Sequence, residues 1–194
     1  AASSNPYSKE ISYTINQPLS NSLTTPVDQA ISSSLKSSAS QTATNNALSG
    51  IYYGNQGWEM EDIKALEQWQ GKKHTIVELF TNWDSEPHVS DNLFKQQLPN
   101  IWNNQNVPLI TWDPYVQGTT PNDIEVQIAN GDYDAYINNW AEQIKTFLSG
   151  NNGIYNTQDD RRAYLRLAHE MNGDWYPWSA AMGNNSPADY VRMW

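Results

Sequence analysis

The sequence has no cysteine and only three histidines among its 194 residues. The lack of thiols excludes disulfide bonds and thiolate metal sites, and three distant histidines give little support for zinc. His169-Glu170 could begin the zinc-binding helix motif of metalloproteases, but that motif needs a second histidine three positions after the glutamate, where this chain has Gly173. We therefore expect no metal and no other cofactor.

Basic residues are also scarce. Eleven Lys and Arg stand against 21 Asp and Glu, which gives a formal net charge of −10. Nucleic acids and anionic membrane surfaces bind clusters of basic residues, so we expect neither as a partner. A neutral polysaccharide places no such demand on charge. The chain also lacks a run of about 18 apolar residues, so we expect no membrane-spanning segment.

Glycine is absent from the first 49 residues, whereas 13 of the first 50 are serine. This composition is typical of a linker or a poorly packed leader. We therefore divide the chain into a Ser/Thr/Asn-rich leader or linker at residues 1–49 and a folded domain at 50–194. The leader is either a solvated tail or a partly ordered segment that drapes over the domain. It contains no visible secretory signal peptide.

From Ile51 onward, short apolar strands alternate with helical stretches, the pattern of a parallel sheet with helices outside it. Four such units are half of a (β/α)8 TIM barrel, which usually needs about 250 residues. We therefore predict an α/β fold and interpret the domain as the amino-terminal half of a barrel. A complete small fold is the alternative, but it would leave a sheet edge and an apolar inner face exposed. The predicted strands are 51–54, 74–80, 107–112 and 163–170, and the predicted helices are 59–69, 91–104, 133–148 and one from Pro187.

Polar and aromatic residues gather where the predicted strands end. Because the carboxyl ends of parallel strands form the face on which barrels build active sites, these residues are candidates for substrate binding. Nine Trp and eleven Tyr favour this interpretation, since aromatic rings beside polar turns can stack on sugars. The alternative is that they mark ordinary strand-to-loop transitions. The candidates are Tyr53, Asn82, Trp83, Trp112, Asp113, Glu170 and Asn172.

The segment at 166–178, RLAHEMNGDWYPW, combines an acid, an imidazole, an amide and several aromatic rings after an apolar strand. Cleavage of a glycosidic bond uses a positioned carboxylic acid to protonate the leaving oxygen, while flat rings and amides hold the sugar. Glu170 is the candidate acid. Beside Trp rings, we expect it in a partly desolvated pocket that raises its pKa and keeps it protonated. The alternative is a surface glutamate at a strand end.

This segment resembles the fourth-strand signature of glycoside hydrolase family 26, a family of (β/α)8 barrels that cleave β-linked polysaccharides with retention of configuration. The order of strands and helices over residues 51–194 supports the resemblance. The resemblance implies that Glu170 is the general acid/base and that His169 orients it or forms a hydrogen bond near it. It also implies that Asn172 lies beside the sugar and that Trp175 stacks at or next to the cleavage point. Trp178 is a further candidate for substrate binding.

A retaining mechanism also needs a nucleophilic carboxylate about 5 to 5.5 Å from the acid. In the resembled family this glutamate lies near the end of the seventh strand, which this chain does not reach. Asp84 and Asp113 follow strand ends, but we assign neither as the nucleophile. The resemblance thus implies a nucleophile outside this fragment, a fragment inactive by itself, and a secreted, extracellular protein that is a monomer at full length. Its expected partner is a polysaccharide or oligosaccharide substrate.

The residues after the third strand bear on the substrate. Mannan-cleaving members of the resembled family usually carry His directly after the third-strand Trp, whereas this chain has Trp112-Asp113-Pro114. This departure favours β-glucan, with a β-mannanase or a non-catalytic polysaccharide-binding protein as alternatives. Trp83 and Tyr115 are candidate sugar platforms, although either could be an ordinary packing residue.

Strand parity adds one structural prediction. If Glu170 points into the barrel, Arg166 shares its face, is buried there and needs a carboxylate partner. Glu78, in the middle of the apolar second strand, is the natural one. We expect this pair to support the structure rather than contact substrate, because buried charges are normally paired.

Overall fold

Four parallel strands form one sheet in the order β1-β2-β3-β4. The structure is a computed structural model that describes residues 47–83, 87–182 and 184–194, and Ala47–Trp194 form one unit. Nearly all of the predicted leader at 1–49 lies outside the described residues. The α/β class with a parallel sheet is confirmed. The strands are β1 (Gly50–Tyr52), β2 (Ile76–Trp83), β3 (Val107–Val116) and β4 (Tyr164–Leu167).

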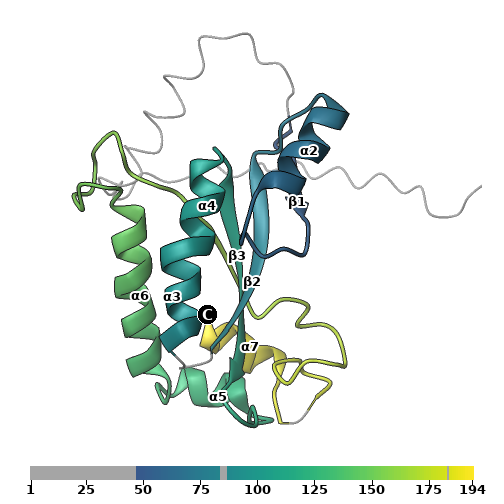
Figure 1. The fold of residues 1–194 in the computed structure, drawn as a ribbon. Coiled ribbons are helices and arrows are strands. Elements are labelled where there is room, and N and C mark those ends of the chain that lie inside the picture. Colours follow the sequence, from purple (N-terminus) through teal and green to yellow (C-terminus); the bar gives the residue numbers. More distant parts are fainter. Residues whose placement is uncertain (1–46, 84–86, 183) are drawn as a thin grey trace, which may run out of the picture. The chain divides into compact units, whose positions relative to one another are not determined.

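Helices follow each strand along the chain (Figure 1). The four predicted helices are confirmed to within a few residues at their ends. Between β3 and the long helix the structure has a further helix of six residues, too short to show a helical period in the sequence. The helices are α2 (Glu61–Gln70), α3 (Pro87–Asn92), the π-helical turn η1 (Leu93–Gln97), α4 (Leu98–Asn103), α5 (Ile124–Ala129), α6 (Asp134–Leu148) and α7 (Pro187–Met193).

The hydrophobic core lies between the sheet and the layer that contains α4 and α6 (Figure 1). Alternate residues of β2 and β3, such as Leu79 and Ile110, are fully buried there. Trp112 on β3 stacks on Trp140 of α6, with ring centroids 4.3 Å apart. This aromatic contact fixes the long helix against the strand.

The opposite face of the sheet carries polar and aromatic side chains. Glu78 and Phe80 alternate with the buried residues of β2 and therefore point to this side. The strand register places Tyr52 of β1 and Tyr164 of β4 on the same face. These two residues are 51% and 49% exposed. The face is thus open enough to carry a site.

The last strand is shorter than predicted. β4 ends at Leu167 rather than Glu170, because Ala168 and Glu170 both adopt left-handed backbone conformations with φ of 48° and 53°. A strand cannot continue through such residues. The His-Glu motif therefore lies in a turn just beyond the strand.

None of the helices in the described part of the chain has the length and apolar character needed to cross a membrane.

Candidate active site

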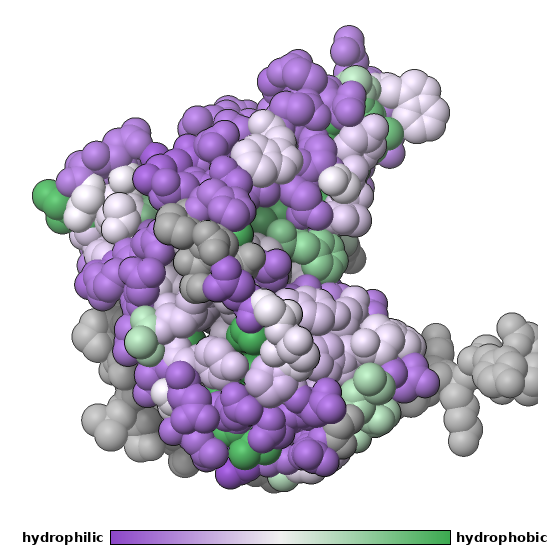
Figure 2. All heavy atoms as spheres, turned by 60° about the horizontal axis from the view of Figure 1, so that its bottom comes forward, coloured by the Kyte–Doolittle hydropathy of each residue, from purple (hydrophilic) through white to green (hydrophobic). Residues whose placement is uncertain are grey.

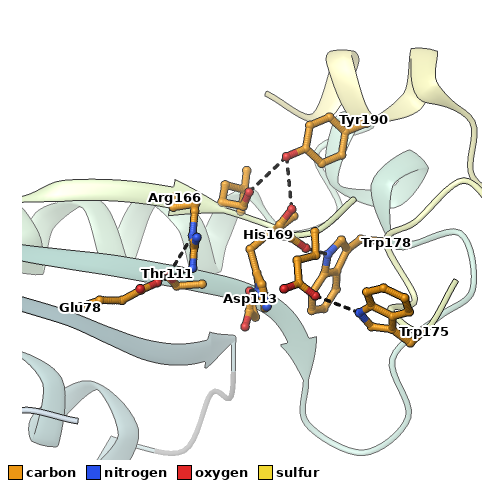
Figure 3. Close-up of polar contacts among 11 residues, drawn as sticks. Glu78, Thr111, Asp113, Arg166, His169, Trp175, Trp178 and Tyr190 are labelled. Atoms are coloured by element: carbon orange, nitrogen blue, oxygen red, sulfur yellow. Dashed lines mark hydrogen bonds and ion pairs between the residues drawn. The ribbon is translucent and has the colours of Figure 1, made fainter. Parts of the chain in front are cut away.

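The turn after β4 holds the candidate acid in a strained backbone. Positive φ at a residue other than glycine costs about 1 to 3 kcal/mol, and such strain is concentrated at functional sites. Here two such residues flank His169. The Ala168 amide donates to the carbonyl of Trp112 at 3.1 Å, and the Tyr190 hydroxyl of α7 lies 3.2 Å from the Ala168 carbonyl oxygen (Figure 3). Contacts from β3 and α7 therefore hold the turn in place.

His169 is paired with Asp113 at the end of β3. Its Nδ1 lies 2.7 Å from Asp113 Oδ1, and the two side chains are 7% and 10% exposed (Figure 3). Burial raises the pKa of the Asp113 carboxyl, and the hydrogen bond with His169 opposes that rise. With its carboxylate accepting the Nδ1 proton, Asp113 fixes the orientation of the imidazole ring.

Aromatic rings enclose the imidazole. Phe80 meets it edge-on at 5.2 Å between ring centroids, and Tyr176 lies 4.7 Å away. The indole N–H of Trp178 donates to the His169 carbonyl oxygen at 2.7 Å. His169 is therefore fixed by its backbone and by its side chain.

Glu170, the next residue along the chain, is exposed. Its Oε2 accepts a hydrogen bond from the Trp175 indole N–H at 3.1 Å (Figure 3). The exposure is a correction to the partly desolvated pocket predicted from sequence. Glu170 is exposed because it lies in the turn after β4 rather than in the strand. Its hydrogen-bond partner Trp175 is itself 59% exposed.

Gly173 makes room for that indole ring. A Cβ atom at this position would lie 2.6 Å from Cε2 and 2.7 Å from Cζ2 of Trp175. These distances are shorter than any Cβ contact a folded protein accepts, so only glycine lets the ring lie across the turn. The sequence Glu170-Met-Asn-Gly-Asp-Trp175 thus specifies the contact between the ring and the acid.

Tyr176 belongs to the site although sequence analysis did not select it. Burial raises the pKa of its hydroxyl, and the negative charges of Glu170 and Asp113 raise it further. Its ring lies 4.7 Å from the His169 ring, measured between ring centroids. Its ring stacks on Trp178 at 4.5 Å and 8°. Because the segment after Glu170 is irregular, no periodicity in the sequence shows which of its rings faces the acid.

Three tryptophans predicted to bind substrate occupy other positions. Trp83, Trp112 and Trp178 are 2%, 5% and 0% exposed. Trp83 and Trp112 lie 4.6 Å apart on the helix-covered side of the sheet, and Trp178 lies under Tyr176. The structure corrects all three predictions, because strand alternation and ring packing cover the faces that a sugar would need. Trp178 instead supports His169.

The other predicted site residues lie at the surface or near it. Tyr115 is 38% exposed and meets Trp178 edge-on at 4.8 Å. Tyr53 is 46% exposed, and Asn82 and Asn172 are exposed. Tyr115 therefore adjoins the group around His169. Asp84 lies outside the described residues.

The predicted pair of Arg166 and Glu78 is confirmed. Arg166 Nη2 pairs with Glu78 Oε1, and Thr111 lies between them, donating its hydroxyl to Glu78 at 2.6 Å (Figure 3). The guanidinium Nε also donates to Thr111 Oγ1 at 3.0 Å. The predicted burial of Arg166 is wrong, because its side chain is 43% exposed on the open face of the sheet.

Metal binding has no cluster to support it within the ranges the structure describes. Among those residues, no group of three or more His, Cys, Asp or Glu side chains could hold an ion.

Comparison with known proteins relates the chain to one named enzyme. It is 32% identical to Endoglucanase H of Acetivibrio thermocellus over 130 residues, which are 67% of this chain. The aligned part is only 12% of that protein's length. Among solved structures, this chain is also similar to the YdhT protein from Bacillus subtilis, with a TM-score of 0.49 and 20% sequence identity. That match covers 78% of this chain and 50% of the other. No family model matches the sequence.

Proposed function

We propose that this chain carries the acid/base half of a glycoside hydrolase site that cleaves β-linked glucan. The sequence relationship to Endoglucanase H supports glycan degradation in general. The observation that carries the proposal is the contact between the exposed Glu170 carboxyl and the Trp175 indole, beside the buried pair of His169 and Asp113. An acid, a sugar-sized aromatic surface and a fixed imidazole thus meet at the end of one strand.

Glu170 supplies the proton in this mechanism. The Trp175 N–H holds Oε2, which leaves Oε1 to carry the proton to the glycosidic oxygen as the bond to the anomeric carbon breaks. A sugar lying against the rings would exclude water from the carboxyl before cleavage. The leaving group departs as the nucleophilic carboxylate bonds to the anomeric carbon. Water then breaks that bond by attacking the same carbon, and the Glu170 carboxylate takes the proton that the water loses.

The nucleophile in our proposal lies outside residues 1–194. Asp113 is already engaged with His169 and is buried, so it is poorly placed to attack an anomeric carbon. We therefore propose a retaining member of glycoside hydrolase family 26, in which this domain forms half of a (β/α)8 barrel and does not hydrolyse glycan by itself. We further propose that the protein acts outside the cell as a monomer.

Substrate preference rests on the same strand end. The carboxylate of Asp113 follows Trp112 and orients His169, a pairing that a histidine at position 113 could not make with the same charge. We propose β-glucan as the substrate, with β-mannan as the second candidate. Comparing hydrolysis of the two polysaccharides by the full-length protein decides between them.

The function is tested by Glu170→Gln in the protein encoded by the complete reading frame. We expect the variant to lose glucan hydrolysis and to keep glucan affinity, because the amide cannot donate a proton but fills the same space. Equal hydrolysis by the wild type and the variant would reject Glu170 as the acid. Loss of both hydrolysis and affinity would show that Glu170 stabilises the fold rather than takes part in the reaction.

A further inference from the structure

The loop between β1 and α2 is held by contacts to three other elements. Gln56 accepts a hydrogen bond from the Phe80 amide of β2 at 2.7 Å, and its own carbonyl accepts one from Gln97 of η1, also at 2.7 Å. Asn100 of α4 donates to the carbonyls of Gly57 and Trp58 at 3.1 and 2.9 Å. The backbone on both sides of Trp58 is therefore fixed.

Glycine is required next to Trp58. Gly57 has a φ of 76°, and a Cβ atom there would lie 2.8 Å from Cδ1 of Ile101. The loop thus packs directly on α4, in a conformation that other residues rarely adopt. This close approach sets the direction in which the next side chain leaves the backbone.

The side chain held in this way is not part of the core. Trp58 is 46% exposed, whereas the buried tryptophans of this domain are 5% exposed or less. An exposed large aromatic ring on a fixed loop loses little entropy when it binds a partner, because its position is already set. A single exposed ring is common at protein surfaces, so the features that distinguish Trp58 are its fixed loop and the hollows beside it.

Trp58 borders two hollows. The first, of about 250 Å³, is lined by Trp58 and by Phe80, Asn82, His88, Asn92 and Gln97, among others. The second, of about 430 Å³, is lined by Trp58, Asn100, Asn103 and Asn104, together with Met60 and the charged residues Glu59, Glu61 and Lys64. Both combine the indole ring with side-chain amides. Amides donate and accept hydrogen bonds as sugar hydroxyls do, and neither hollow contains a cluster of basic residues.

The first hollow adjoins the candidate active site. Phe80 lines it and also meets the His169 ring at 5.2 Å. Asn82 lines it too, and is the register partner of Asp113 at the ends of β2 and β3. Figure 2, in which the bottom of Figure 1 comes forward, shows residues of intermediate hydropathy gathered between hydrophilic margins. The Phe80 ring therefore links the hollow beside Trp58 to the candidate active site.

We propose that Trp58 is the platform of a distal subsite that binds a neutral β-gluco-oligosaccharide chain beyond the unit being cleaved. This inference rests on the proposed function and names a second position on the same substrate. The pyranose ring stacks on the indole face, and its hydroxyl groups bind the side-chain amides of the two hollows other than Gln97 and Asn100, whose N–H groups already hold the loop. Only oligosaccharides long enough to extend from Glu170 to Trp58 gain from the contact.

Binding of cellohexaose and cellobiose to the 1–194 chain, measured by titration calorimetry, tests this subsite. We expect Trp58→Ala to weaken cellohexaose binding about tenfold, the usual loss for an aromatic anchor, and to leave cellobiose binding unchanged. Trp58→Phe should recover part of the affinity. Trp69→Ala is the matched control, because Trp69 is 82% exposed on α2 and lines neither hollow.

Equal cellohexaose affinity in the wild type and Trp58→Ala would overturn the subsite, as would equal losses in Trp58→Ala and Trp69→Ala. Because binding is measured without turnover, this result is independent of the Glu170→Gln hydrolysis test. If hydrolysis depends on Glu170 but Trp58→Ala binds cellohexaose as tightly as the wild type, the subsite is rejected and the proposed acid stands. If Trp58→Ala binds cellohexaose more weakly but Glu170→Gln hydrolyses glucan normally, the subsite stands and Glu170 is rejected as the acid.

Discussion

His169 Nδ1 lies 2.7 Å from Asp113 Oδ1, and this contact joins the end of β3 to the turn that carries Glu170. Both side chains are buried, so each depends on the other for a hydrogen-bond partner. The acid itself is exposed. The site therefore consists of a rigid buried pair and an accessible carboxyl one residue away.

Removing the partner of His169 tests the role of Asp113 in positioning. We expect Asp113→Ala to lower the free energy of unfolding by about 1 to 3 kcal/mol, since it leaves a buried imidazole N–H without an acceptor. Asp113→Asn keeps an acceptor oxygen and should cost less. Chemical denaturation measures both, and NMR of the His169 ring reports whether its tautomer changes. An unchanged His169 signal in Asp113→Ala would contradict the positioning role.

The Glu78 and Arg166 pair should matter more for stability than for substrate choice. We expect Glu78→Gln to lower the free energy of unfolding by about 1 kcal/mol, because Arg166 and Thr111 lose a charged partner while Arg166 stays partly hydrated. Glu61→Gln is the control, since that glutamate is 77% exposed in a surface pair. Thermal unfolding compares the variants. An unchanged Tm together with lost turnover would instead place Glu78 in the reaction.

Gly173 offers a way to disturb the acid without changing it. We expect Gly173→Ala to displace the Trp175 ring, because the new Cβ would lie 2.6 Å from Cε2, and so to break the hydrogen bond to Glu170. Turnover in the full-length protein should fall about tenfold or more for the loss of this contact. Trp175→Phe, which removes the N–H and keeps a ring, should give a similar fall. Full activity in both variants would show that the contact has no part in catalysis.

A buried carboxyl on α5 predicts a pH-dependent stability. Glu125 is 1% exposed, neither of its oxygens has a hydrogen-bond partner, and burial with a smaller contribution from Asp189 raises its pKa to about 7. Because this folded-state pKa is above the unfolded value of 4.5, the stability that protonated Glu125 gives at low pH is lost as pH rises toward and through 7. The loss amounts to at most about 3 kcal/mol.

Glu125→Gln cannot ionise, so the variant should lack this part of the pH dependence. We expect the wild type to lose more stability than Glu125→Gln between pH 5 and 8, as measured by urea unfolding at each pH. Parallel curves for the two proteins would show that Glu125 does not titrate in this range.

Regular alternation made part of this structure predictable from sequence. Two-residue periodicity in β2 and β4 places Glu78 and Arg166 on one face, and their pairing follows from the cost of an unpaired charge. The same periodicity indicates that Trp112, one residue before Asp113, points to the opposite face, toward α6. A position at a strand end therefore does not decide whether a ring is exposed.

The turn after β4 was less predictable. Ala168 and Glu170 adopt positive φ without being Gly or Asn, so their residue types give no sign of the conformation. The strand consequently ends earlier than predicted and Glu170 is exposed. In the irregular segment that follows, packing alone decides that Trp178 is buried and Trp175 is not.

Chemical rescue of Glu170→Ala in the protein encoded by the complete reading frame tests the central claim most directly. An aryl β-glucoside whose phenolate leaves without protonation bypasses the acid, and azide can replace the water that Glu170 activates. We predict that the variant fails on glucan, forms the glycosyl-enzyme from the activated substrate, and regains turnover with azide as a β-glycosyl azide product. Normal hydrolysis of glucan by Glu170→Ala, or no rescue by azide in a folded variant, would contradict the assignment of Glu170 as the acid/base.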